Sequence, residues 1–116
     1  MENKEHIVIS LGGSLIVPDQ IDVGFLKAFI ASIREFATKG FHFIIITGGG
    51  RASRNYTLAS KEISNPSNED LDWIGIEATR LNAEFVRVGF GDIACPQIIF
   101  DPTQIPETDK SIILGG

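Results

Sequence analysis

Cysteine, basic residues and long hydrophobic runs are scarce in this sequence. Cys95 is the only cysteine, so no disulfide can form within the chain, and a reducing cytoplasm is the expected location. No apolar run approaches the roughly 18 residues of a membrane span, so we expect no membrane partner. Lysine and arginine together number 10 against 15 acidic residues, and the net charge of −5 argues against binding to a nucleic-acid polymer.

The rest of the composition is that of a soluble globular protein. Hydrophobic residues make up 43% of the chain and charged residues 22%. A chain of 116 residues can bury roughly two thirds of its unfolded surface, which is enough for one hydrophobic core. We therefore expect residues 1–116 to form a single domain.

Three consecutive glycines follow the strand-forming residues 44–47, and a helical pattern begins directly after them. An apolar run that ends in glycine fits a buried strand of a parallel sheet, with a loop at its carboxyl end. Glycines let backbone N–H groups approach a ligand closely, and a helix that starts there directs its unpaired N–H groups to the same place. Arg51 and Arg54 add positive charge. The pattern indicates a phosphate-binding loop, although a tight turn without a ligand would use the same glycines.

The same arrangement occurs near both ends of the chain. Residues 6–11 form a β-rich run before the glycine turn 12–14, and residues 111–114 form another before the glycine pair 115–116. Parallel strands end at one edge of their sheet, and in open α/β sheets ligands bind at that edge. We therefore expect the turns at 12–14 and 48–50 to lie side by side.

Hydrophobic periodicity predicts a helix on each side of the second strand. The first spans about 22–39, with Asp22 as its N-cap, and Gly40 ends it. Its phenylalanine row is expected to belong to the core: Phe25, Phe29, Ile33 and Phe36. The second helix spans about 50–63, and the side chains that it should bury are Tyr56, Ala59 and Ile63.

A third predicted helix has the most regular pattern in the sequence. It begins at Ser67 or Asn68, extends over about 20 residues, and has one apolar face: Leu71, Ile74, Ala78, Leu81, Phe85 and Val88. The opposite face is either solvated or functional, and it carries Asp72, Thr79 and Asn82. After this helix, residues 97–100 are expected to form a short strand.

Four segments match known motifs in the expected order, at residues 9–14, 48–56, 71–83 and 114–116. The second reads GGG-x-x-x-R-x-Y, and the third contains D-x-x-G-x-x-x-T-R-x-N. By these segments the chain resembles the amino acid kinase superfamily, and most closely its archaeal-type uridylate (UMP) kinase branch. The resemblance implies a three-layer α/β/α sandwich with a mainly parallel sheet, which is incomplete here. It also implies transfer of the γ-phosphoryl group of ATP to UMP, giving UDP.

The resemblance further assigns roles to individual residues. The catalytic turn, against the ATP phosphates and the transferred group, would be Gly12, Gly13 and Ser14. The remaining contacts with ATP would come from Ser10, Leu11, Gly50 and Arg54. The contacts with UMP would come from Gly49, Asp72 and Thr79. Mg²⁺ would accompany ATP, bound chiefly through phosphate oxygens and water and not through ligands from this chain. The family also implies a homo-oligomer, a hexamer.

Two departures from the family pattern affect these expectations. Many members carry a lysine where this chain has Ser10, so the main catalytic cation is left unassigned. The family also continues well beyond the final glycine pair, where its ATP-binding half follows. We therefore expect the natural polypeptide to continue past Gly116, and residues 1–116 to be an N-terminal, UMP-binding lobe that is inactive alone or nearly so.

Two other functions would fit the same fold. One is a kinase of another small phosphate or carboxylate acceptor, for instance isopentenyl phosphate, and the other is a non-catalytic protein that stores a nucleotide or an oxyanion. A dinucleotide-binding Rossmann domain is disfavoured, because the turn 12–14 lacks the G-x-G-x-x-G spacing and no acidic residue ends the second strand.

Overall fold

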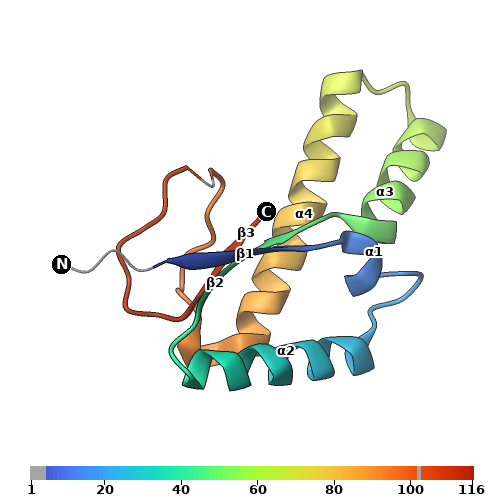
Figure 1. The fold of residues 1–116 in the computed structure, drawn as a ribbon. Helices are drawn as coiled ribbons and strands as arrows, with labels where there is room; N and C mark the ends of the chain where they lie inside the picture. Colours follow the sequence, from blue (N-terminus) through green and yellow to red (C-terminus); the bar gives the residue numbers. More distant parts are fainter. Residues whose placement is uncertain (1–4, 102) are drawn as a thin grey trace.

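The computed structural model describes residues 5–101 and 103–116. A three-stranded sheet carries helices on one face, and a helical hairpin extends from its edge (Figure 1). The elements are, in chain order, β1 (His6–Leu11), α1 (Gly13–Ile16), α2 (Val23–Thr38), β2 (His42–Thr47), α3 (Gly50–Ile63), α4 (Asn68–Phe90), the 3₁₀ turn η1 (Gly91–Ile93) and β3 (Ile112–Gly115). The three strands that end in glycine and the three long helices are thus confirmed, whereas the one-turn helix α1 was not predicted.

The sheet is parallel throughout, with the strand order β1-β2-β3. Leu11 lies opposite Thr47, and Ile46 lies opposite Gly115. All three strands therefore end at the same edge, and each is followed by its glycine turn there. The prediction of a parallel sheet with glycine turns along one edge is confirmed.

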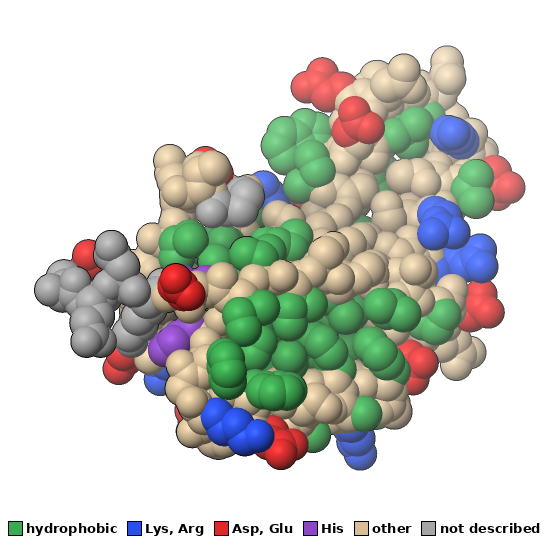
Figure 2. All heavy atoms as spheres, viewed as in Figure 1, with side chains coloured by type: hydrophobic (Ala, Val, Ile, Leu, Met, Phe, Trp, Pro, Cys, Tyr) green, Lys and Arg blue, Asp and Glu red, His purple; other side chains and the backbone are tan. Residues whose placement is uncertain are grey.

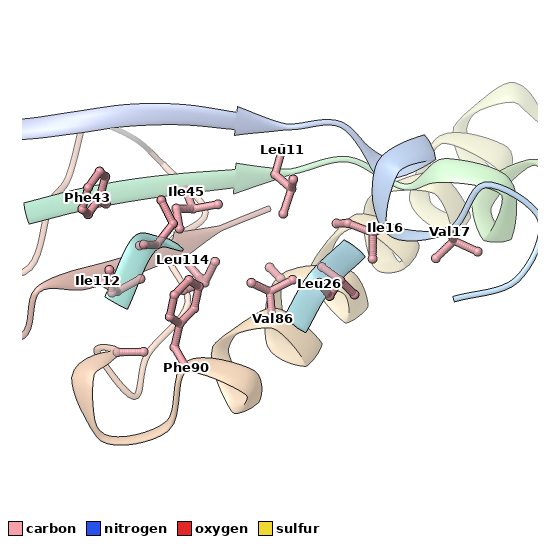
Figure 3. Close-up of a cluster of buried hydrophobic side chains, with 13 residues drawn as sticks. Leu11, Ile16, Val17, Leu26, Phe43, Ile45, Val86, Phe90, Ile112 and Leu114 are labelled. Atoms are coloured by element: carbon pink, nitrogen blue, oxygen red, sulfur yellow. The ribbon is translucent and has the colours of Figure 1, made fainter. Parts of the chain in front are cut away.

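One face of the sheet forms the main hydrophobic core. Side chains from all three strands point to this face, where α2 and α4 cover them (Figure 3). The largest side chains in this cluster that are fully shielded from solvent are Ile16, Ile45, Val86, Phe90, Ile112 and Leu114. Because this core joins the sheet to α2 and to the second half of α4, it fixes the position of α4 relative to the glycine turns.

The opposite face of the sheet is covered by the segment that follows α4. Ile44 and Ile113 pack there against Cys95 and Ile99. The prediction of a strand over residues 97–100 is wrong, because this segment makes a single bridge, between Ile99 and Gly115, and then turns away. The one cysteine is a buried core residue, as its apolar surroundings favour.

Helix α2 begins and ends where the sequence predicts. The Asp22 carboxylate accepts a hydrogen bond from the Phe25 N–H at 3.0 Å, and Gly40 takes the left-handed conformation, with φ of +94°, just after the helix. Leu26 and Ile33 are buried, but Phe36 is 47% exposed. The expectation that the whole phenylalanine row is core is therefore wrong for Phe36, which lies at the rim, whereas Ile33 of the same row packs in the core beside Leu26.

Helix α3 has no buried residue, which contradicts the predicted apolar face. Tyr56 is 65% exposed and Ile63 is 84% exposed, and Ala59 is exposed as well. The reason is the position of the helix, because α3 lies beyond the edge of the sheet and packs mainly against α4 and α1 (Figure 1).

Helix α4 is rotated relative to the prediction. Ser67 is its N-cap, as expected, and accepts a hydrogen bond from the Asp70 N–H at 3.1 Å. Its buried residues are Ala78, Asn82, Ala83, Val86 and Phe90, whereas Leu81, Phe85 and Val88 are exposed. The face predicted to be polar thus turns inward at Asn82. Although α4 has 23 residues, neither it nor another helix of the described ranges is long and apolar enough to cross a membrane.

Candidate functional site

A cleft of about 800 Å³ separates α3 from α4 and reaches the glycine turn after β2. The turn contributes Gly49 and Gly50 to its lining. The wall formed by α3 consists of Ser53, Arg54, Thr57 and Lys61, and the wall formed by α4 consists of Leu71, Asp72, Gly75, Ile76 and Thr79. The cleft therefore lies at the carboxyl edge of the parallel sheet, where the sequence predicts a ligand.

The two glycine turns pack directly against each other, backbone to backbone. The Gly48 N–H donates to the Leu11 carbonyl at 3.2 Å. A Cβ atom added to Gly13 would lie 2.1 Å from the Gly50 nitrogen, and Gly50 has φ of +63°, which favours glycine. The prediction that the turns at 12–14 and 48–50 lie side by side is confirmed. The close approach also explains why side chains are missing at Gly13 and Gly50.

Helix α4 holds the turn after β2 from the side opposite to β1. The Asn82 side-chain amide donates to the carbonyl oxygens of Gly48, at 2.8 Å, and of Gly49, at 3.2 Å. The Thr47 hydroxyl donates to the Thr79 carbonyl oxygen at 3.0 Å. These contacts lie between the strand end and the helix, so the polar face of α4 is partly an internal surface.

The positive charges near the turn differ in where they point. Arg51 leaves the site, because its guanidinium pairs with Asp19 at 3.3 Å and donates to the Pro18 carbonyl oxygen at 3.2 Å. Arg54 and Lys61 line the cleft instead. Lys and Arg side chains gather on the α3 side of the molecule in Figure 2. The wall formed by α3 therefore supplies hydroxyl and cationic donors that suit an anionic ligand.

The wall formed by α4 carries one carboxylate among small and apolar residues. Asp72 is exposed and lines the cleft. The Thr79 hydroxyl donates to the Gly75 carbonyl oxygen at 3.0 Å, so towards a ligand this hydroxyl can only accept a hydrogen bond. A Cβ atom on Gly75 would lie 3.4 Å from the Ser53 Oγ, so glycine there lets the two helices approach each other.

The predicted site residues fall into two neighbouring groups. One group lines the cleft, namely Gly49, Gly50, Arg54, Asp72 and Thr79. The other group forms the end of β1 and the turn beside it, namely Ser10, Leu11, Gly12, Gly13 and Ser14. Leu11 is buried in the core, so only its backbone could contact a ligand.

Sequence reasoning missed part of the α3 wall. Ser53, Thr57 and Lys61 recur every four residues and so lie on one face of the helix. That spacing was the available signal. It is not distinctive, because a polar row on a helix usually faces solvent.

Within residues 5–101 and 103–116, no group of three His, Cys, Asp or Glu side chains could hold a metal ion. Away from the cleft, the side-chain hydroxyl and then the backbone N–H of Thr103 donate to Asp101 and lower the pKa of this exposed carboxyl from its usual 3.8. The donors that the cleft itself offers to an anion are the N–H groups of its glycine turn and the hydroxyl and cationic side chains of α3.

Comparisons with known proteins agree with this architecture. The family model of the amino acid kinase family matches residues 5–113. A uridylate kinase from Thermoplasma acidophilum is 39% identical over 97% of this chain and 49% of its own length, and one from Methanosarcina barkeri is 37% identical over 95% and 47%. The chain thus spans about half the length of the curated relatives that it matches.

A solved structure has the same fold. The crystal structure of uridylate kinase from Archaeoglobus fulgidus superimposes with a TM-score of 0.71 at 23% identity, over 97% of this chain and 50% of that one. At this identity the likeness concerns the fold. Together with the match of the family model over nearly all the described residues, it shows that this chain belongs to the amino acid kinase family.

Proposed function

We propose that this chain forms the UMP-binding part of a uridylate kinase, which transfers the γ-phosphoryl group of ATP to UMP and so gives UDP. The observation that carries the proposal is the cleft between α3 and α4, which has anion donors at the glycine turn and a single carboxylate on the α4 wall. Relatives named uridylate kinase match nearly the whole chain, which supports the same acceptor.

In this proposal the two ends of UMP meet different chemistry. The phosphate lies against Gly49, at the start of α3, where backbone N–H groups and the positive end of the helix favour an anion. Asp72 accepts hydrogen bonds from the ribose hydroxyls, because a carboxylate repels phosphate but pairs well with two neutral donors. Thr79, which is limited to accepting, lies on the same wall.

The ATP phosphates would lie on the side of the turn 12–14. Gly12, Gly13 and Ser14 contact the transferred group, and Ser10 and the Leu11 backbone complete that side. Gly50, at the junction of the two turns, and Arg54, which lines the cleft, would contact the ATP phosphates and lie next to the phosphate of UMP. Phosphoryl transfer needs mainly alignment and neutralisation of spreading charge, and fixed N–H donors supply both.

Mg²⁺ belongs to the proposal only as a companion of ATP, held by phosphate oxygens and water. The donor set of the cleft contains one carboxylate, Asp72, so we assign no metal ligand to this chain and route no step through the ion. We also propose a cytoplasmic location, which a single buried thiol fits.

Self-association is the remaining part of the proposal. Hydrophobic side chains gather between β1 and α2 in Figure 2, and Ile7 and Phe36 of these elements are exposed. Such a surface favours contact with another protein surface, and a homo-oligomer, a hexamer in this family, would cover it.

Titration calorimetry on the 116-residue chain tests the acceptor. We expect UMP to bind, and uridine and isopentenyl phosphate to bind at least about tenfold more weakly, because each lacks one of the two recognised groups. Equal or tighter binding of isopentenyl phosphate would favour the kinase of another acceptor. Binding of molybdate without any binding of UMP would favour a storage protein.

A further inference from the structure

We propose that Asn82 is a positioning residue for the glycine turn. Its side-chain amide holds two carbonyl groups on the α4 side, so that the N–H groups of Gly49 and Gly50 face the phosphate of the ligand. This inference rests on the proposed function, because it concerns the phosphate end of the same cleft.

Asn82 is a polar side chain in an apolar setting. It is 5% exposed, and its helix buries Ala78, Ala83 and Val86 around it. An amide that is buried without hydrogen-bond partners is destabilising, whereas an apolar side chain would carry no such penalty. Both hydrogen bonds of its NH₂ group go to the glycine turn, at 2.8 Å to Gly48 and 3.2 Å to Gly49. The side-chain amide of Asn82 is therefore used to hold the glycine turn in place.

Because the peptide bond is planar, these two hydrogen bonds also fix the direction of the N–H groups of Gly49 and Gly50. The carbonyl group of one residue and the N–H group of the next belong to the same trans unit and point in opposite directions. Holding the Gly48 carbonyl against the Asn82 amide therefore directs the Gly49 N–H away from that amide, and the Gly49 carbonyl does the same for the Gly50 N–H. Neither N–H donates to another group of the described chain, and both residues line the cleft.

The turn needs such an external support because it has no side chains of its own. Glycine has wider backbone freedom than other residues, so ordering it loses more conformational entropy. The Thr47 hydroxyl fixes the strand end to the same helix, at 3.0 Å from the Thr79 carbonyl oxygen. If the turn is already ordered before the ligand binds, the entropy cost of ordering it does not reduce the affinity for the ligand.

The test is the ratio of the affinities for UMP and uridine, measured by calorimetry on the 116-residue chain. We expect Asn82→Leu to weaken UMP binding about tenfold and to change uridine binding less than twofold, because only the phosphate uses the oriented N–H groups. The matched control is Asn65→Leu, an identical change at an exposed position between α3 and α4, and its ratio should equal that of the unmodified chain.

The outcomes separate this inference from the proposed function. If the unmodified chain does not bind UMP, the proposed function fails. If it binds UMP and Asn82→Leu keeps the UMP-to-uridine ratio, or weakens both ligands equally, the positioning role is overturned while the function stands.

A second measurement needs no variant, and it applies if Asn82→Leu does not fold. In nitrogen-15 spectra of the unmodified chain, we expect UMP, but not uridine, to shift the side-chain amide signal of Asn82 together with the backbone signals of Gly49 and Gly50. Binding of UMP that leaves these three signals in place would overturn the inference.

Discussion

The two halves of α4 have different surroundings. The second half packs into the main core, where Val86 and Phe90 are fully buried against the sheet and α2. The first half, before Ala78, has no buried residue and instead forms one wall of the cleft, with Asp72 and Gly75 towards α3. One helix therefore connects the open cleft to the main core, which is formed by the sheet, α2 and the second half of α4 and is called the base below.

This difference separates stability from binding. Val86 and Phe90 in the second half are shielded from water, so loss of either side chain should lower the free energy of unfolding of the whole chain. The region around the cleft contributes little buried apolar surface, since α3 contributes no buried side chain. Hydrogen bonds from Thr47 and Asn82 to backbone carbonyl groups join the turn after β2 to α4. Changes there should affect ligands more than folding.

The largest expected effect is in the base. Phe90→Ala removes a ring that is fully buried, and we expect it to lower the free energy of unfolding by about 3–5 kcal/mol. Tyr56→Ala, at an exposed aromatic residue of α3, should change it by less than about 0.5 kcal/mol. Urea unfolding followed by circular dichroism measures both. Equal losses would show that the cleft region is as important to folding as the core.

The contact between the glycine turns can be tested with a pair of adjacent glycines. A Cβ atom at Gly13 would lie 2.1 Å from the Gly50 nitrogen, whereas one at Gly12 would meet nothing within 4 Å. We expect Gly13→Ala to destabilise the chain by about 1–3 kcal/mol, because backbone must move. Gly12→Ala, where φ is −57°, should leave stability nearly unchanged. Similar midpoints for the two variants in urea would contradict the packing described here.

On the α4 wall, Asp72→Ala should reduce UMP affinity at least about tenfold, since hydrogen bonds to a charged group contribute about 1.5–3 kcal/mol. The same variant should bind 2′-deoxy-UMP almost as well as the unmodified chain does, because that ligand offers fewer hydroxyl groups. Calorimetry with both ligands measures the selectivity. An unchanged preference for UMP over the deoxy compound would remove Asp72 from the ribose site.

The smallest expected effect concerns two arginines of α3. Arg54 lines the cleft, whereas Arg51 pairs with Asp19 outside it. Arg54→Gln should weaken UMP binding about fivefold at low salt, and less at high salt, because exposed charges are screened. Arg51→Gln should change UMP affinity less than twofold. The assignment of charge to the cleft would be wrong if Arg51→Gln had the larger effect.

The strands and the binding edge could be predicted from sequence for a simple physical reason. Each strand is an apolar run that ends in glycine, and parallel pairing brings such ends together without further information. The caps of α2 and α4 were also readable, because Asp22 and Ser67 bind the backbone locally.

The inward face of α4 could not be predicted from hydrophobicity. The predicted row is more regular than the buried one, yet only its first part turns inward, at Ala78, and Leu81, Phe85 and Val88 face solvent. The buried row contains Asn82, whose burial depends on carbonyl groups contributed by residues 48 and 49, far away in sequence. A pattern within one helix does not reveal such partners. The exposure of Tyr56 on α3 has the same origin, because the helix lies beyond the sheet edge that its apolar residues were expected to cover.

A crystal structure of the chain with UMP tests the central claim most directly. We predict that the phosphate lies against the N–H groups of Gly49 and Gly50 and that the ribose hydroxyls donate to Asp72. The chain also has an apolar groove of about 410 Å³ between α2 and α4, on a different side of α4. UMP bound in that groove, with the cleft between α3 and α4 empty, would contradict the claim.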